Sequence, residues 1–254
     1  MGAEVCRAVM ADEELELVAA VDPLHDGTQL DSIAATLGSE LVIADHPEAL
    51  TKAGAKVAVD FTVAEAAFGN IKWCLSNGVH VVVGTTGLTP AQLDELRALQ
   101  SKESKANLFI APNFAIGAVL MMEFARQAAR FLPDAEIIEL HHPGKKDAPS
   151  GTAIKTVEGI SEARKSKGTA DESSEVLPGA RGAEKDGVHV HSVRLPGLVA
   201  HQEVIFGGTG QTLSIRHDST DRTSFMPGVL LAIKKIGPLD GVTIGLEHVL
   251  DLGL

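Results

Sequence analysis

The residues best suited to chemistry lie together in one segment, EIIELHHPGKKDAPSGTA, at positions 136–153. It holds two adjacent histidines, His141 and His142, and Lys145 follows them across a Pro-Gly turn. A Ser-Gly-Thr run at 150–152 then opens a predicted helix, whose N-terminal N–H groups and macrodipole favour an anion. Imidazole, ammonium and helix N-terminus together predict a carboxylate-binding site with a proton donor beside it.

A zinc site is the alternative interpretation of His141 and His142, because neutral imidazole is also a metal ligand. Adjacent histidines lack the His-x-x-x-His spacing of a helical metal site, and no cysteine or third ligand lies nearby in the sequence. In a strand the two side chains also face opposite ways, so only one of them points into a given cleft. We expect no resident metal, and a zinc hydrolase is the weaker alternative.

The overall charge requires that any site for an anion be built locally. The 254 residues include 34 acidic and 22 basic side chains, a formal net charge of -12. This balance disfavours a nucleic-acid surface, which needs a basic stripe, and would repel an anionic ligand at long range. Two cysteines, Cys6 and Cys74, exclude a disulfide framework. No apolar run reaches the roughly 18 residues of a membrane span and no signal-peptide pattern is present, so we expect a cytoplasmic protein.

The elements that position this segment fall into two parts. Up to residue 114, continuous apolar strands alternate with helices, which is typical of a doubly wound parallel sheet covered on both faces. Ligands of such sheets bind at the carboxyl ends of the strands, and an acidic residue after an early strand often binds the ribose. The helices are expected at 2–11, 63–78 and 89–102, the last capped by Thr89, and the strands at 15–22 (ending at Asp22), 56–62, 79–84 and 106–114.

The second part, 115–223, is expected to form an α+β domain with a mainly antiparallel sheet, because its later strands follow one another without intervening helices. A last helix capped by Ser224 is expected to return to the first domain, which would then comprise 1–114 with 224–254. In the second domain the helices are expected at 115–130 and 153–165, and the strands at 135–142, 188–195, 201–208 and 211–217.

ELHHPGKKDAPSGTA closely resembles the signature of the 4-hydroxy-tetrahydrodipicolinate reductase (dihydrodipicolinate reductase) family of lysine and diaminopimelate biosynthesis. VDFT, GTTG, APNFAIG, LPGARG, VHVHSVRLPGLVAHQEVIFG and DRTSF resemble that family in the same order, so the resemblance covers nearly the whole chain and is closest to the actinobacterial branch. It implies an enzyme in which NADH or NADPH reduces a cyclic dicarboxylate with loss of water. It also implies a Rossmann-like domain joined to an α+β domain for substrate binding and assembly into a cytoplasmic homotetramer.

The resemblance also implies roles for individual residues. His141 corresponds to the catalytic proton donor and acceptor of the family, and Lys145 to its second proton donor. His142 corresponds to a substrate-binding histidine, and Gly151 with Thr152 to the pair that binds a substrate carboxylate. The cofactor-binding residues correspond to Gly84, Thr85, Thr86, Ala111, Pro112, Asn113 and Phe114, and Asp22 occupies the position of the ribose-binding acid.

The beginning of the sequence departs from the family pattern. Family members begin with a strand and a Gly-x-x-Gly-(Arg/Lys)-x-Gly loop, of which only Met1-Gly2 corresponds here. We therefore expect a dinucleotide-binding sheet that lacks its first strand, as an incomplete or mis-started gene would encode. The alternative is a catalytically weak protein of the same fold that binds the dicarboxylate without a cofactor.

Overall fold

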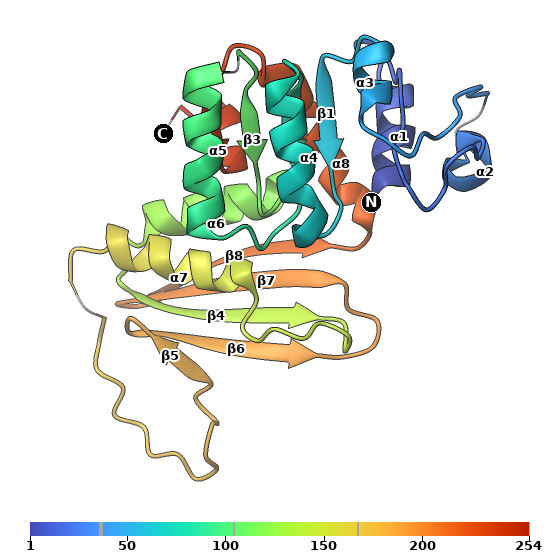
Figure 1. Ribbon diagram of the computed structural model, residues 1–254. Coiled ribbons are helices and arrows are strands. Elements are labelled where there is room, and N and C mark those ends of the chain that lie inside the picture. Colours follow the sequence, from blue (N-terminus) through green and yellow to red (C-terminus); the bar gives the residue numbers. More distant parts are fainter. Residues whose placement is uncertain (36–37, 104, 167, 254) are drawn as a thin grey trace. The chain divides into compact units, whose positions relative to one another are not determined.

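The computed structural model describes residues 1–35, 38–103, 105–166 and 168–253. The chain divides into two compact units, Met1–Phe114 with Phe225–Leu254 and Ala115–Ser224. Each unit contains its own sheet (Figure 1). In the described part of the chain, no helix has both the length and the apolar character of a membrane span.

The first unit is built on a parallel sheet with the strand order β1-β2-β3-β9. The central strands are continuous buried apolar runs, as expected where helices cover both faces. The predicted parallel sheet is therefore confirmed. Its strands are β1 (Val57–Asp60), β2 (His80–Val83), β3 (Leu108–Ile110) and β9 (Val242–Ile244), and its connecting helices are α4 (Ala64–Ser76) and α5 (Pro90–Glu103).

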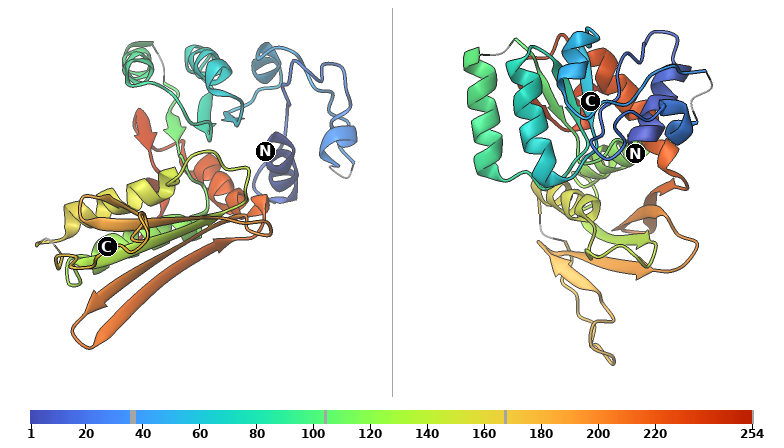
Figure 2. Two further views of the ribbon diagram at one scale, coloured as in Figure 1. Left: turned by 90° about the horizontal axis from the view of Figure 1, so that it is seen from below. Right: turned by 45° about the vertical axis from the view of Figure 1, so that its right-hand side comes forward.

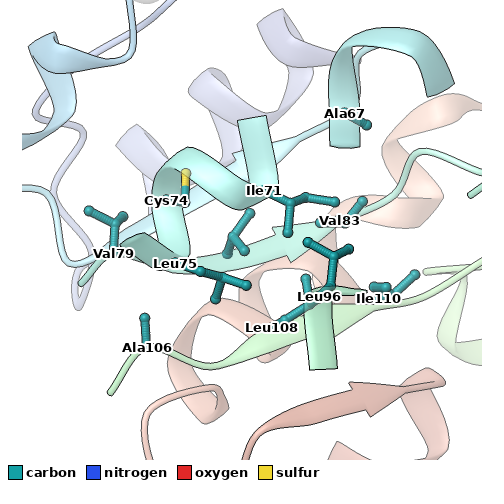
Figure 3. Close-up of a cluster of buried hydrophobic side chains, with 11 residues drawn as sticks. Ala67, Ile71, Cys74, Leu75, Val79, Val83, Leu96, Ala106, Leu108 and Ile110 are labelled. Atoms are coloured by element: carbon teal, nitrogen blue, oxygen red, sulfur yellow. The ribbon is translucent and has the colours of Figure 1, made fainter. Parts of the chain in front are cut away.

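Local sequence determines where the connecting helices begin and what they bury. Thr89 accepts a hydrogen bond from the backbone N–H of Gln92 at 3.2 Å, and the Gln92 side chain accepts from the N–H of Thr89 at 2.8 Å. This reciprocal pair is a capping box and confirms the predicted start of α5. Helix α4 buries Ala67, Ile71 and Cys74 along one stripe, which packs on the sheet and on α5 (Figure 3).

The predicted strand at 15–22 is not formed. The structure has the predicted α1 (Gly2–Ala11), but the following segment makes only an isolated parallel bridge between Val21 and Ala44. An apolar run becomes a strand only where a neighbour supplies hydrogen bonds along its length, and no other described segment pairs with this one. Instead, residues 15–21, α1 and β1 contribute to the lining of a cavity of about 640 Å³. Two short helices follow, α2 (Leu30–Ala34) and α3 (Glu48–Lys52).

The second unit contains a mixed sheet with the strand order β5-β6-β4-β7-β8. Only β4 and β6 are parallel, and the other neighbours are antiparallel, so the predicted mainly antiparallel sheet is confirmed. Helices α6 (Ile116–Ala128) and α7 (Gly151–Ala163) lie side by side on one face of it (Figure 1 and Figure 2). The strands are β4 (Asp134–His141), β5 (Ala183–Lys185), β6 (Val188–Arg194), β7 (Ala200–Gly208) and β8 (Gln211–Ser219).

The last helix, α8 (Met226–Lys235), belongs to the first unit, where it packs against α1 and β2. The prediction that Ser224 caps it is wrong. Residues Arg222–Phe225 form a 3-10 turn, which places Phe225 at the N-cap, and the Ser224 hydroxyl instead donates to the carbonyl of Asp221 at 2.7 Å.

Candidate active site

The histidine-lysine segment connects the end of β4 at His141 with the start of α7 at Gly151. Ser150 is the N-cap, with extended backbone angles of φ -66 and ψ 154, and its hydroxyl accepts from the N–H of Ala153 at 3.2 Å. The helix therefore begins two residues earlier than predicted. As a result Gly151 and Thr152 lie in its first turn, where the macrodipole favours an anion.

The two histidines differ in exposure. The His141 side chain is only 14% exposed, and its Nδ1 lies 2.5 Å from Oε2 of Glu139. Residues two apart in a strand share a face, so β4 places this carboxylate directly beside the imidazole. His142 lies just beyond the strand and is exposed, and its ring lies over Gly144, where a Cβ would come within 3.2 Å of Nδ1.

Glu139 is a fully buried acid behind His141, and the sequence analysis did not single it out. Arg194, at the end of β6, donates to both of its carboxylate oxygens at 2.8 and 2.9 Å. The parallel register of β4 and β6 pairs His141 with Arg194, which explains why the three side chains meet. The sequence signal for Glu139 was a glutamate at the end of the apolar run in EIIEL. A buried glutamate needs a charged or polar partner, and only the fold shows which residue that partner is.

For both Glu139 and His141, the contact between the two side chains shifts the pKa in the direction opposite to the shift caused by burial. Burial would raise the pKa of Glu139, but hydrogen bonds, led by that from Arg194, outweigh it and hold this pKa below its ordinary value. Burial lowers the pKa of His141, and this effect exceeds the opposing influence of Glu139. Lys145 and Arg194 lower the His141 pKa further, so the ligand-free site favours neutral imidazole beside an ionised carboxylate.

Lys145 lies in the loop that follows β4, and its charge helps to lower the pKa of His141. Its Nζ donates to both carboxylate oxygens of Asp147, at 2.8 and 2.9 Å. The hydrogen bond from Lys145 holds the pKa of Asp147 below its usual range. His141, Lys145 and the first turn of α7 therefore lie along one short stretch of chain in the second unit.

The predicted cofactor residues lie at the carboxyl ends of the parallel strands in the first unit. Asp60, at the end of β1, is buried and accepts from the hydroxyls of Thr62 and Thr85 at 2.8 and 3.0 Å. A Cβ on Gly84 would come within 2.0 Å of the Phe61 ring, so only glycine fits there. Small residues and backbone amides held at this edge of the sheet fit a nucleotide.

The predicted residues after β3 are part of the same edge, whereas Asp22 lies in a separate turn. Ala111 donates to the carbonyl of Val83 in β2 at 3.0 Å, and the rings of Phe114 and Phe61 lie 5.6 Å apart. Asp22 accepts from the N–H of Leu24 at 2.9 Å. The structure therefore places 84–86 and 111–114 at one edge of the sheet, whereas Asp22 forms hydrogen bonds with Leu24, His25 and Ala44.

Two cavities in the described part of the chain are lined by residues other than the predicted site residues. A cavity of about 1180 Å³ in the second unit is lined by charged residues that include Glu136 and Arg181, but by none of the predicted site residues. The 640 Å³ cavity in the first unit reaches the end of β1 at Asp60–Thr62. Within the described ranges, no three or more His, Cys, Asp or Glu side chains form a cluster that could hold a metal ion.

Two family models match the chain. One is described as dihydrodipicolinate reductase, N-terminus, and matches residues 1–114, and the other, described as its C-terminus, matches residues 117–250. Among curated relatives, the 4-hydroxy-tetrahydrodipicolinate reductase of Nocardia farcinica is 51% identical over 99% of this chain and 95% of its own length. The protein of the same name from Listeria welshimeri is 50% identical over 99% of this chain and 96% of its own length.

Solved structures give the same result. Dipicolinate-bound dihydrodipicolinate reductase from Paenisporosarcina sp. TG-14 superposes with a TM-score of 0.85 at 44% identity, covering 98% of this chain and 95% of that one. An amine dehydrogenase from Mycobacterium smegmatis has a TM-score of 0.66 at 14% identity, covering 97% of this chain and 92% of that one, and shares the fold alone.

Proposed function

The chain belongs to the dihydrodipicolinate reductase family, and from that premise we propose how its own residues carry out the family reaction. The activity is NAD(P)H-dependent reduction of 4-hydroxy-tetrahydrodipicolinate in lysine biosynthesis. Substrate, reduced nicotinamide and a proton give tetrahydrodipicolinate, oxidised nicotinamide and water. The observation that supports the residue assignment is that His141, Lys145 and the N-terminus of α7 follow one another along the loop between β4 and α7.

We assign dicarboxylate binding to the loop and to the start of α7. The backbone N–H groups of Gly151 and Thr152 hold one carboxylate, where the macrodipole stabilises negative charge. His142 and Lys145 offset the remaining charge of the dianion, and for this Lys145 exchanges its contact with Asp147 for one with the ligand. The dipicolinate bound to the similar reductase supports a ligand of this class.

We assign proton supply to His141 and Lys145. The nicotinamide, when bound, supplies the hydride, and negative charge then develops on the substrate ring. An imidazolium and an ammonium beside that ring stabilise the charge and deliver the proton, which is where positioned acids and fixed charges lower a barrier most. The dianion also raises the pKa of the His141 imidazole by its charge, which favours the protonated form once the substrate is bound.

We propose that the cofactor, NADH or NADPH, is held by the edge of the first sheet. Gly84, Thr85 and Thr86 would approach the nicotinamide side, together with residues 111–114. Asp22 would bind a ribose hydroxyl, as acids in this position do in other dinucleotide-binding sheets.

We further propose that the enzyme acts in the cytoplasm as a homotetramer. Light scattering after size-exclusion chromatography would test this assembly, and a monomer or dimer would contradict it.

Replacing Gly151 with proline should selectively remove one carboxylate-binding N–H. Proline is compatible with the first turn of a helix, and the extended backbone of Ser150 suits a residue that precedes proline. We expect the dissociation constant of pyridine-2,6-dicarboxylate, measured by calorimetry, to rise about 10- to 100-fold, since a hydrogen bond to a charged group contributes roughly 1.5–3 kcal/mol.

The matched control is Gly151→Ala, which keeps the N–H and whose Cβ would meet nothing within 4 Å. It should bind the dicarboxylate as the unchanged protein does. If Gly151→Pro folds and binds equally tightly, the proposed carboxylate site is wrong.

A further inference from the structure

Glu139 is an unusual residue to find without any exposed surface, because a buried carboxylate is costly unless charged groups pair with it. It is accordingly well paired, since Arg194 binds both of its oxygens and His141 contacts Oε2. Ser192 lies opposite Glu139 in the parallel register and contributes to lowering the pKa of this carboxyl. Hydrophobic residues could fill this position more simply, so the charge calls for an explanation beyond packing.

The contact with His141 determines which ring nitrogen is available. The 2.5 Å separation between His141 Nδ1 and the ionised carboxylate places the proton of the neutral ring on Nδ1. Nε2 is then the nitrogen that can take up a proton and give it to a ligand. A carboxylate in this position also stabilises the imidazolium form, as buried acids behind catalytic histidines do elsewhere.

The contact with Arg194 links the Glu139 carboxylate indirectly to Lys145. Arg194 donates from Nη2 to the backbone carbonyl of Asp147 at 2.7 Å, while the side chain of Asp147 holds Nζ of Lys145. The loop that carries Lys145 is therefore tied to Glu139 through one guanidinium. Both proposed proton donors are connected to a single buried acid within the second unit.

We propose that Glu139 is a positioning residue, which orients His141 with Nε2 toward the ligand and, through Arg194, holds the Lys145 loop in place. Glu139 does not itself touch the substrate in this arrangement. The inference rests on the proposed roles of His141 and Lys145. It identifies Glu139 as the group that holds both proton donors in the arrangement needed for proton transfer. Glu139, Lys145 and Arg194 are the charged groups that act on the His141 imidazole, and His142 is its chain neighbour.

Glu139→Gln tests the inference because glutamine keeps the shape and removes the charge. We expect kcat to fall about 10- to 100-fold, as when other second-sphere partners of a functional histidine are removed. We expect the dissociation constant of pyridine-2,6-dicarboxylate to rise by a smaller factor than kcat falls, because Glu139 acts on binding only through the loop that carries Lys145. Without the carboxylate the pKa of His141 falls, so the limb of the kcat/KM profile that declines with rising pH moves to lower pH.

A direct readout of the ring does not depend on activity. Proton–nitrogen correlation NMR of histidine-labelled protein should show His141 as the Nδ1–H tautomer in the unchanged protein. In Glu139→Gln it should show a lower pKa and a mixture of tautomers, because the glutamine amide can donate to Nδ1 as well as accept from it. An unchanged kcat, together with an unchanged tautomer and pKa, would overturn the inference.

A matched control and a conservative variant complete the experiment. Glu136 lies on the same strand and also contacts a histidine and an arginine, His191 at 2.9 Å and Arg181, and its side-chain hydrogen bonds in the described part of the chain do not reach the loop. Glu136→Gln should leave kcat and the pH profile unchanged. Glu139→Asp retains the charge, so it should fold even if Glu139→Gln does not. Its carboxylate is withdrawn by one methylene, and it should lose roughly tenfold in kcat.

Full kcat in Glu139→Asp, with the pH limb in its normal place, would overturn the inference even if the glutamine variant did not fold. Failure of the proposed function looks different. If His141→Ala keeps its turnover, the proton-donor role is wrong whatever Glu139 does. If His141→Ala loses turnover while Glu139→Gln keeps it, only the positioning role fails.

Discussion

Lys145→Ala is expected to lower kcat by roughly 10²–10⁴, the range for losing a general acid. The ammonium both supplies a proton and offsets negative charge that develops as the hydride arrives, so its loss acts mainly on the transition state. The dissociation constant of pyridine-2,6-dicarboxylate should also rise, because the same group offsets the charge of the bound dianion. Steady-state oxidation of NADH or NADPH measures the first effect and calorimetry measures the second.

Lys146→Ala is the control for Lys145→Ala, because it removes the same charge from the neighbouring, exposed position. It should keep nearly normal kcat, which shows that local positive charge alone does not explain the effect. If Lys145→Ala retained near-normal kcat, the proposed role of Lys145 as a proton donor would be wrong.

His141→Ala is the second change with a large expected effect, and we again expect kcat to fall roughly 10²–10⁴-fold. His142→Ala should instead mainly raise KM, because this exposed histidine is assigned to binding and not to proton transfer. The split between kcat and KM in adjacent residues is therefore the diagnostic result.

The pH dependence gives an independent check on His141. Burial holds its pKa below the ordinary value, and the protonated form is the proton donor, so kcat/KM should decline as the pH rises through this lowered pKa. That limb should disappear in His141→Ala. If the variant kept the limb at the same pH, another group would be the titrating acid.

The sequence predicts the parts of the fold that depend on local hydrophobic patterns and helix-capping residues. Buried parallel strands read as continuous apolar runs, and Thr89 as an N-cap residue located the start of α5. The apolar run at 15–22 has the same pattern as a strand, but within the described residues its pairing is limited to one bridge between Val21 and Ala44, so no strand forms. Strand β9 was missed because three residues carry too little periodicity to be recognised.

Part of the candidate site could also be predicted from local sequence, and part could not. His141, Lys145 and Gly151 lie within one short segment, so their spacing predicted both an anion site and a proton donor. Glu139 escaped notice because its meaning depends on Arg194, which is 55 residues away and reaches it only through the pairing of β4 with β6. The register of a sheet is a property of the whole unit and cannot be read from either strand alone.

The most direct test of the central claim is the oxidation of reduced nicotinamide by the purified chain in the presence of 4-hydroxy-tetrahydrodipicolinate. We expect NADH or NADPH to be consumed only when the substrate is present, tetrahydrodipicolinate to form in equal amount, and pyridine-2,6-dicarboxylate to inhibit. A folded chain that binds pyridine-2,6-dicarboxylate by calorimetry but binds and oxidises neither nicotinamide would contradict the account, and would identify a dicarboxylate-binding protein that shares the fold without the reaction.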